Sequence, residues 1–437
     1  MSKSDQIQIS LTTLAYGGDC LGRLPDGRAA FVPYALPGET VAARLLEEKR
    51  GHVRAEMVEL LQPSPERISP RCPHYFVPGG QLACGGCHYQ HLSLPSQLRA
   101  KTGILRDQLA RIGGIADPPV LPAVSSPQAW NYRNHIQFHL SPQGKLGFEA
   151  LRSSTVCPIQ ECHLPETALN AIWPQIDLQP IPGLERLALR LGADDEVLLV
   201  CESDEPLNFL IEDLPISAVQ LSSAGRAVLA GSDYLIIGGE SASAETSSHA
   251  AQSAPALSRP FHVSADSFFQ VNTLQAAAMA AHLLAELPLA SSTTLLDLYC
   301  GVGLFSAYLA DKVARLVGVE ISPSACADFA INLDEFDNVE LYQAAVEDAL
   351  PALDIRPQVI VLDPPRAGVD RRALDAILAL GAETIAYVSC DPATLARDAR
   401  RLAQGGYHLR QITPFDLFPQ TYHIESISFW EKSRQIE

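Results

Sequence analysis

The chain of 437 residues is long enough for about three domains. Hydrophobic residues make up 47% and charged residues 19%, the balance of a globular protein. No apolar run reaches the roughly 18 residues that span a bilayer, and the start MSKSDQIQISL lacks the apolar stretch of a secretory signal. A cytoplasmic protein without membrane contact is therefore expected, and its ten cysteines favour metal or catalytic roles over disulfides.

The net charge of −18 argues at first against nucleic-acid binding, because contacts to phosphates come from Lys and Arg. The charge is unevenly distributed, however. Residues 1–111 carry +3, residues 112–262 carry −10 and residues 263–437 carry −11. A polyanionic partner would therefore meet the N-terminal third first, or a local group of basic side chains elsewhere.

The first part of the chain, residues 1–62, has the pattern of a small closed β-barrel of the OB type. Its short β-rich runs are broken by turn signals such as Gly17-Gly18 and Asp26-Gly27, and they lie at 7–11, 29–32, 40–45 and 54–60. The alternative is an accessory β domain without a ligand. Residues 63–112 follow as a cysteine-rich segment and a helix, predicted at 95–112 from its apolar face.

Two further domains are expected. Residues 113–260 are β-rich, and within them residues 239–258 are rich in Ser and Ala, which predicts a flexible insertion. Residues 261–437 alternate between strands and helices, so a parallel, doubly wound sheet is expected, with its chemistry at the carboxyl ends of the strands. The strands are predicted at 294–299, 316–320, 358–363 and 384–389, and the helices at 305–314, 322–334 and 371–380.

The segment LLDLYCGVGLFS, residues 295–306, predicts a strand, a glycine turn and the start of a helix that holds a ligand. Gly301 and Gly303 are followed by Ser306 where a dinucleotide-binding loop needs its third glycine. Glu320 ends the next strand, where a carboxylate can bind the hydroxyls of a ribose. A ribose-binding residue beside a poor pyrophosphate loop favours S-adenosylmethionine, whose charged end is an amino acid.

Four cysteines are candidate metal ligands. Cys84 and Cys87 have the C-x2-C spacing of zinc and iron–sulfur sites, Cys72 lies upstream, and Cys162 lies far downstream. Four thiolates, three local and one distant, would suit a [4Fe–4S] cluster. Zinc with mixed ligands and unliganded thiols remain alternatives, and Cys157 is an alternative distant ligand.

A strand-end cysteine predicts covalent chemistry. Cys390 lies in a turn before a helix, and Glu425 follows near the end of the chain. Carbon 5 of uracil becomes nucleophilic when a thiolate adds to carbon 6, and a base must then remove the carbon 5 proton. At the other strand end, Arg366 follows Asp363-Pro364-Pro365 where methyltransferases of adenine amino groups have an aromatic residue, so that chemistry is disfavoured.

Taken together, these motifs resemble one family. The chain is similar to RNA (uracil-5-)methyltransferases with an N-terminal TRAM domain and a [4Fe–4S] cluster, which act on 23S rRNA and, in some relatives, on tRNA. The resemblance runs from about residue 7 to residue 431. Its motifs, in chain order, are FFQVN (268–272), DLYCGVGLF, GVE (318–320), LDPPRAG, SCDP and HIES.

The resemblance implies a TRAM barrel, a central RNA-binding domain and a Rossmann-like transferase domain, in a monomer that acts on 23S rRNA foremost. It implies Cys390 as the nucleophile and Glu425 as the base. The donor S-adenosylmethionine would be bound by Gln270, Tyr299, Glu320 and Asp363, and the cluster by Cys72, Cys84, Cys87 and Cys162. The alternatives are a tRNA methyltransferase and an RNA-binding iron–sulfur protein with an inactive transferase domain. Phosphate contacts are expected from Arg44, Lys49, Arg50, Arg54, Arg99, Lys101 and Arg133.

Overall fold

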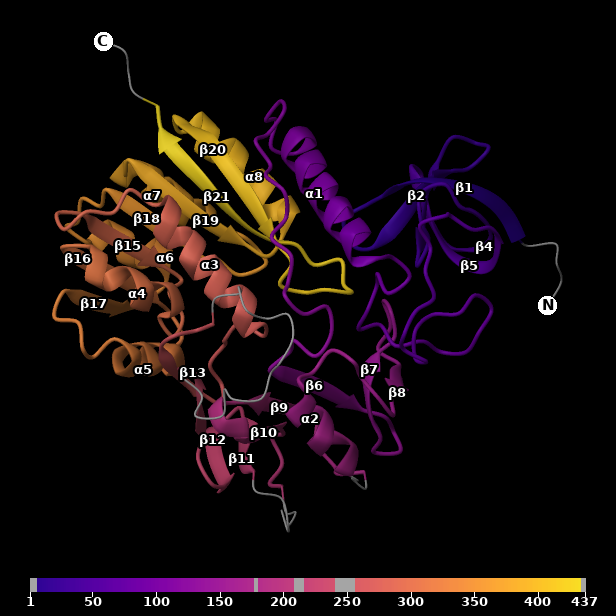
Figure 1. The fold of residues 1–437 in the computed structure, drawn as a ribbon, viewed down its shortest axis with the longest axis horizontal. Helices are drawn as coiled ribbons and strands as arrows, with labels where there is room; N and C mark the ends of the chain where they lie inside the picture. The colour runs from indigo at the N-terminus through magenta and orange to yellow at the C-terminus, as the bar shows by residue number, and fades with distance from the viewer. Residues whose placement is uncertain (1–5, 177–179, 208–215, 240–255, 434–437) are drawn as a thin grey trace.

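The computed structural model describes residues 6–176, 180–207, 216–239 and 256–433. Three bodies surround a shared centre in Figure 1: an N-terminal barrel, a central β-sheet and a C-terminal sheet covered by helices. Among the described residues, no helix has the length and hydropathy needed to cross a bilayer. The predicted insertion at 239–258 lies, apart from its ends, outside the described residues.

The N-terminal barrel closes in the order β1-β2-β3-β5-β4. Alternate residues of these strands point inward, and Ile9, Val32 and Val53 are among those fully buried in its core. The predicted barrel is therefore confirmed. Its strands are β1 (Gln6–Leu14), β2 (Asp19–Arg23), β3 (Ala29–Pro33), β4 (Thr40–Glu48) and β5 (His52–Gln62).

Helix α1 (Leu94–Arg111) follows the cysteine-rich segment and packs against the C-terminal body. Pro95 lies in its first turn, where a missing N–H costs nothing. Its apolar side, including Leu105 and Leu109, is buried in the hydrophobic core of the C-terminal sheet. Figure 1 shows α1 alongside α8 (Pro392–Gln404), so an N-terminal helix completes the C-terminal body.

The central body is a seven-stranded sheet in the order β12-β11-β10-β9-β6-β7-β8. Helix α2 (Thr167–Ile172) supplies Leu169 to the core on one side. A two-stranded pair, β13 (Tyr234–Gly238) with β14 (Pro260–Ser264), leads into the C-terminal body. The seven strands are β6 (His135–Leu140), β7 (Leu146–Glu149), β8 (Val156–Pro158), β9 (Arg186–Leu191), β10 (Val197–Glu202), β11 (Ser217–Ser222) and β12 (Gly225–Ala230).

The C-terminal body has a seven-stranded sheet in the order β17-β16-β15-β18-β19-β21-β20. The first five strands are parallel, while β21 runs antiparallel between β19 and β20. The strands are β15 (Thr294–Leu298), β16 (Arg315–Glu320), β17 (Val339–Gln343), β18 (Val359–Leu362), β19 (Thr384–Ser389), β20 (Tyr407–Phe415) and β21 (Glu425–Lys432).

Helices cover both faces of this sheet. One core includes side chains of α3 (Thr273–Glu286), α4 (Leu304–Leu309) and α5 (Pro323–Asn332), and the other includes those of α1, α6 (Val346–Ala349), α7 (Arg371–Leu380) and α8. All four residues of β18 and all six of β19 are buried, as expected of parallel strands with two covered faces. The predicted α/β fold with a β-rich N-terminal part is confirmed.

Candidate active site

The predicted site residues of the C-terminal body follow the carboxyl ends of neighbouring strands. Tyr299 follows β15, Glu320 ends β16, Asp363 follows β18 and Cys390 follows β19. The strand order changes direction between β15 and β18, where open α/β sheets bind their ligands. Chain topology thus brings four residues that are far apart in sequence to one edge of the sheet.

The loop between β15 and α4 is held by its backbone and by Glu320. Tyr299 and Gly303 have positive φ angles of 60° and 89°. The carboxylate of Glu320 accepts hydrogen bonds from the backbone N–H groups of Gly301 (3.0 Å), Ile321 (2.8 Å) and Ser322 (2.8 Å). Three of roughly four acceptor positions on the carboxylate are thereby filled, which fixes its orientation.

A cavity of about 590 Å³ adjoins this loop. Tyr299 and Glu320 line it, together with Arg371 at the start of α7. Its volume suits a small-molecule ligand. Of the four predicted donor-binding residues, Gln270 and Asp363 lie outside the described lining of this cavity, Gln270 being buried on the segment between β14 and α3.

Strand pairing brings Cys390 next to Glu425. β19 and β21 are antiparallel, and Ser389 is paired with Ser426, so Cys390 and Glu425 are the next residues on the two strands toward the site. Sequence analysis placed both at the site separately, but it gave no antiparallel partner for β19. The insertion of β21 beside β19 is what joins them.

The site is buried and acidic. Burial raises the pKa of Glu425 well above its ordinary value, and the neighbouring carboxylate of Asp363 adds to this effect. Burial also raises the pKa of Asp363 to about 7 and that of the Cys390 thiol to about 12, the latter with help from Glu425 and Asp363. Arg366 opposes these effects by lowering the pKa of Cys390 and of Glu425. Cys390 and Glu425 therefore favour their protonated forms at neutral pH, while Asp363 is divided between its two forms.

Sequence analysis missed Asp297, which lies on β15 within the same acidic group. Its side chain is 1% exposed, and its carboxylate accepts a hydrogen bond of 2.6 Å from the Ser306 hydroxyl. Burial raises its pKa to about 7, with contributions from Asp363 and Glu320. An aspartate inside an apolar strand just before a glycine turn was the available signal.

The predicted phosphate contact by Lys101 is wrong. The side chain lies on the inner face of α1 and is 2% exposed, and its ammonium donates to Asp416 (2.6 Å) and to the carbonyl of Phe418 (2.9 Å). Arg99, on the same helix, does reach the surface, where it pairs with Glu66. Lys101 thus holds together two parts of the fold instead of meeting a ligand.

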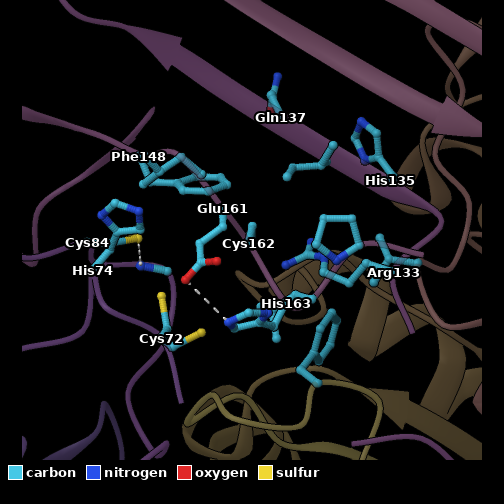
Figure 2. Close-up of a pocket in the computed structure, with 18 of the residues that line it drawn as sticks. Cys72, His74, Cys84, Arg133, His135, Gln137, Phe148, Glu161, Cys162 and His163 are labelled. Atoms are coloured by element: carbon cyan, nitrogen blue, oxygen red, sulfur yellow. Dashed lines mark hydrogen bonds and ion pairs between the residues drawn. The ribbon is translucent and has the colours of Figure 1, made fainter. Parts of the chain in front are cut away.

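The four predicted cluster ligands line a second cavity, of about 450 Å³. Figure 2 shows the sulfur atoms of Cys72 and Cys84 on one side of it and Arg133 on the other. Burial raises the pKa of the Cys87 thiol well above its ordinary value, and the other three cysteines add to this effect. The cavity extends to Arg366, beside the strand ends.

Cys157, the alternative ligand, is on β8 and is not among the residues that line this cavity, and its thiol faces the carbonyl of Leu82. Gly85, between Cys84 and Cys87, allows this turn to pass close to the backbone of Glu149. A Cβ on Gly85 would lie 2.6 Å from the carbonyl oxygen of Glu149. The N–H of Gly86 donates to the sulfur of Cys84 (3.4 Å). Within the described residues, no group of three or more His, Cys, Asp or Glu side chains is placed to hold a single metal ion.

Comparison with known proteins gives two family matches. The family described as tRNA (Uracil-5-)-methyltransferase matches residues 257–433, and the TRAM domain matches residues 5–58. In fold, the chain is similar to the crystal structure of Pyrococcus abyssi tRNA (uracil-54, C5)-methyltransferase in complex with S-adenosyl-L-homocysteine. The TM-score is 0.69 at 22% identity, over 97% of this chain and 100% of that one.

Relatives match over nearly the whole chain. An uncharacterized RNA methyltransferase of Streptomyces coelicolor is 33% identical, covering 98% of this chain and 93% of its own. Another, of Aquifex aeolicus, is also 33% identical and covers 98% of this chain and 99% of its own. The chain belongs to the RNA methyltransferase family that combines an N-terminal TRAM domain with a (uracil-5-)methyltransferase domain.

Proposed function

We propose that this enzyme transfers a methyl group from S-adenosylmethionine to carbon 5 of a uridine in 23S rRNA, through a covalent bond between Cys390 and carbon 6. The observation that carries the proposal is the pairing of β19 with β21. It sets a thiol beside a carboxylate at the edge of the sheet that also holds the donor-sized cavity. A thiol and a base are the two groups that this reaction requires of the protein.

The donor would occupy the 590 Å³ cavity, where it supplies an electrophilic methyl group on a sulfonium. Glu320 and Tyr299, which line the cavity, are proposed to bind its ribose and adenine end. Asp363 and Gln270 are proposed to bind its amino-acid end from the adjoining strand end and loop. The carboxylates around this end would favour the positively charged amino group of the donor.

The protein's own part in the chemistry has two steps. The sulfur of Cys390, after losing its proton, bonds to carbon 6, and the electrons of the C5=C6 double bond pass to the carbonyl oxygen at carbon 4 as an enolate. Carbon 5 then takes the methyl group, and S-adenosylhomocysteine is left. Glu425 accepts the carbon 5 proton, the double bond reforms, and the sulfur leaves carbon 6 as a thiolate.

The four cysteines Cys72, Cys84, Cys87 and Cys162 are proposed to hold a [4Fe–4S] cluster. The donor set supports this, because four thiols line one cavity and a backbone N–H is aimed at a sulfur, as at protein-bound clusters. Each cysteine of a cubane binds a different iron, so the four sulfurs need not surround a single ion. Bound there, the cluster would tie the N-terminal segment to the central sheet, which contributes Cys162.

The 450 Å³ cavity is the proposed path for RNA. Arg133 and Arg366 line it, and the Nε of Arg133 is buried without a hydrogen-bond partner among the described residues. Phe268, 70% exposed, offers a face on which a base can stack. The target uridine would be turned out of its stack, because a strand-end thiol cannot reach carbon 6 within a helix.

Trapping of the covalent adduct tests the mechanism. Cys390→Ala should bind RNA and donor yet transfer no methyl group, because no bond to carbon 6 can form. Glu425→Gln should accumulate a methylated protein–RNA adduct that survives denaturing electrophoresis, since only proton removal is blocked. The double variant should give no adduct. Cys201→Ala, which removes a buried thiol from β10 in the central sheet, is the control and should turn over normally. Product formation by Cys390→Ala would contradict the mechanism.

Mapping of 5-methyluridine by mass spectrometry tests the substrate. In cells that lack the gene, one 5-methyluridine should disappear from 23S rRNA, and the plasmid-borne gene should restore it. Loss from tRNA alone would instead assign the enzyme to tRNA, the substrate named for the Pyrococcus abyssi protein of similar fold.

A further inference from the structure

The turn between β1 and β2 brings the barrel to the active site. Gly17 and Gly18 have positive φ angles of 99° and 88°, so this turn takes a conformation that most side chains resist. A Cβ on Gly18 would lie 3.3 Å from the ring of Tyr422 and 3.4 Å from His88. The turn therefore lies directly on the segment that precedes Glu425 and on the cysteine-rich segment.

Tyr16, in this turn, forms a hydrogen bond with the neighbour of the nucleophile. Its hydroxyl donates to Oδ2 of Asp391 at 2.8 Å, across 375 positions of sequence. Oδ1 of the same carboxylate accepts from the N–H groups of Ala393 (2.8 Å) and Thr394 (2.9 Å) and so caps α8. One carboxylate thus joins the barrel to the first turn of the helix that follows Cys390.

Hydrogen bonds hold this carboxylate in a fixed position relative to Cys390. The hydroxyl of Ser389 donates to the carbonyl oxygen of Asp391 and accepts from its N–H, so residues 389–391 form a tight turn with the thiol at its middle. The ring of Tyr16 is also fixed, because it meets the ring of Tyr422 edge to face at 5.8 Å. A shift of Asp391 would therefore be passed on to Cys390.

We propose that Tyr16 is a positioning residue for methyl transfer, which acts on Cys390 through Asp391. The barrel thereby completes the active site, in addition to any contact that it makes with RNA. The inference rests on the proposed role of Cys390. A misplaced nucleophile lowers the rate of bond formation far more than it lowers binding, because the near-attack geometry is what is lost.

Tyr16→Phe tests the proposal, because it keeps the ring and removes the hydroxyl. We expect kcat and the single-turnover rate of adduct formation to fall roughly tenfold, while KM for RNA and for the donor stays unchanged. Tyr308→Phe is the matched control: its hydroxyl is buried without a hydrogen-bond partner among the described residues, and it should leave kcat unchanged. Gly18→Ala, which pushes the turn away from Tyr422, should lower kcat as well.

A double variant asks whether Tyr16 acts through Asp391. Serine can also cap a helix but is too short to reach Tyr16, so Asp391→Ser keeps the start of α8. Tyr16→Phe should have no further effect in that background. Unchanged kcat in Tyr16→Phe, a change in the KM for RNA alone, or additive effects would each overturn the proposal. Methyl transfer by Cys390→Ala in the same assay would refute the proposed function instead, so the two failures are distinguishable.

Discussion

At the scale of single residues, the charge around Cys390 sets a problem for the chemistry. Burial raises the pKa of the thiol to about 12, and Glu425, Asp363 and Asp391 add to this effect. The proposed reaction needs the thiolate first and the Glu425 carboxylate later, yet burial disfavours both charged forms. Arg366 is the positive charge that lowers the pKa of both groups, so it favours the reactive forms at neutral pH.

Replacement of Arg366 should shift the pH dependence of the reaction. Without the guanidinium, the pKa of Cys390 and of Glu425 rises, so the fraction in the deprotonated, reactive form at neutral pH falls. The rising limb of kcat against pH, measured with saturating RNA, should move upward by roughly half a unit to one unit in Arg366→Gln, since Arg366 is exposed and solvent screens its effect. Arg366→Lys keeps the charge and should retain most of the wild-type profile. An identical profile in Arg366→Gln would contradict this role.

At the scale of elements, the segment between β20 and β21 depends on the N-terminal part of the chain. Lys101 of α1 is paired with Asp416, and Gln97 of the same helix exchanges hydrogen bonds with Gln420. The carbonyl of Gln420 also accepts from the backbone of His88 and Tyr89 in the cysteine-rich segment. These contacts fix the chain just before Glu425 enters β21, so the position of the proposed base depends on elements more than 300 residues earlier.

Removal of Lys101 should therefore lower both stability and activity. In Lys101→Met, Asp416 stays buried without its partner, which costs about 3–5 kcal/mol of unfolding free energy. Unfolding in urea measures this loss, and kcat should fall because the segment before Glu425 loosens. Arg99→Met on the same helix is the control: it breaks an exposed pair with Glu66 and should cost under about 1 kcal/mol.

The double variant Lys101→Met/Asp416→Leu should recover much of the lost stability, because the unpaired buried charge is gone. An equal loss of unfolding free energy in Lys101→Met and in Arg99→Met would show that the buried Lys101–Asp416 pair contributes no more to stability than an exposed pair.

The error at Lys101 shows where sequence reasoning stops. Local patterns predict four of the barrel strands, α1 and four parallel strands of the last sheet, because apolar periodicity and turn residues lie within a few positions of one another. They leave β2 and β17 unpredicted. Whether a lysine on a helix faces water or a buried aspartate 315 positions away leaves no local trace. The same holds for the pairing of Cys390 with Glu425, which depends on β21 entering the sheet between β19 and β20.

At the scale of the whole molecule, three bodies meet around one path from the cysteines to the strand ends. The cavity lined by Cys72 and Cys162 continues to Arg366, so the proposed cluster ligands and the segment that follows β18 face one space. The barrel, the cysteine-rich segment and α1 all contact the segment before Glu425. A change in the cysteine-rich segment should therefore alter the position of the segment before Glu425 and lower methyl transfer.

Loss of one proposed ligand should remove the cluster. Anaerobically purified protein should be brown and contain about four irons per chain, and Cys87→Ser should be pale and iron-poor with a lower melting temperature. Cys157→Ser is the matched control, because this thiol is on β8 and does not line the cavity that the other four share, and the variant should keep its iron. Iron analysis and visible absorption decide the outcome. Iron loss in Cys157→Ser with retention in Cys162→Ser would exchange the two assignments.

The Lys101–Asp416 pair also constrains how the protein can be made. At about 5–20 residues per second, roughly 15–60 s separate the synthesis of the two partners, which lie 315 positions apart. During that interval the barrel can close, but α1 has neither its partner charge nor the sheet that buries it. The strand that completes the sheet, β21, is made after every other strand described, and it enters between two strands already present. In a ribosome-bound chain whose residues up to Lys432 have not all left the ribosome, the barrel should therefore resist protease while α1 is cleaved.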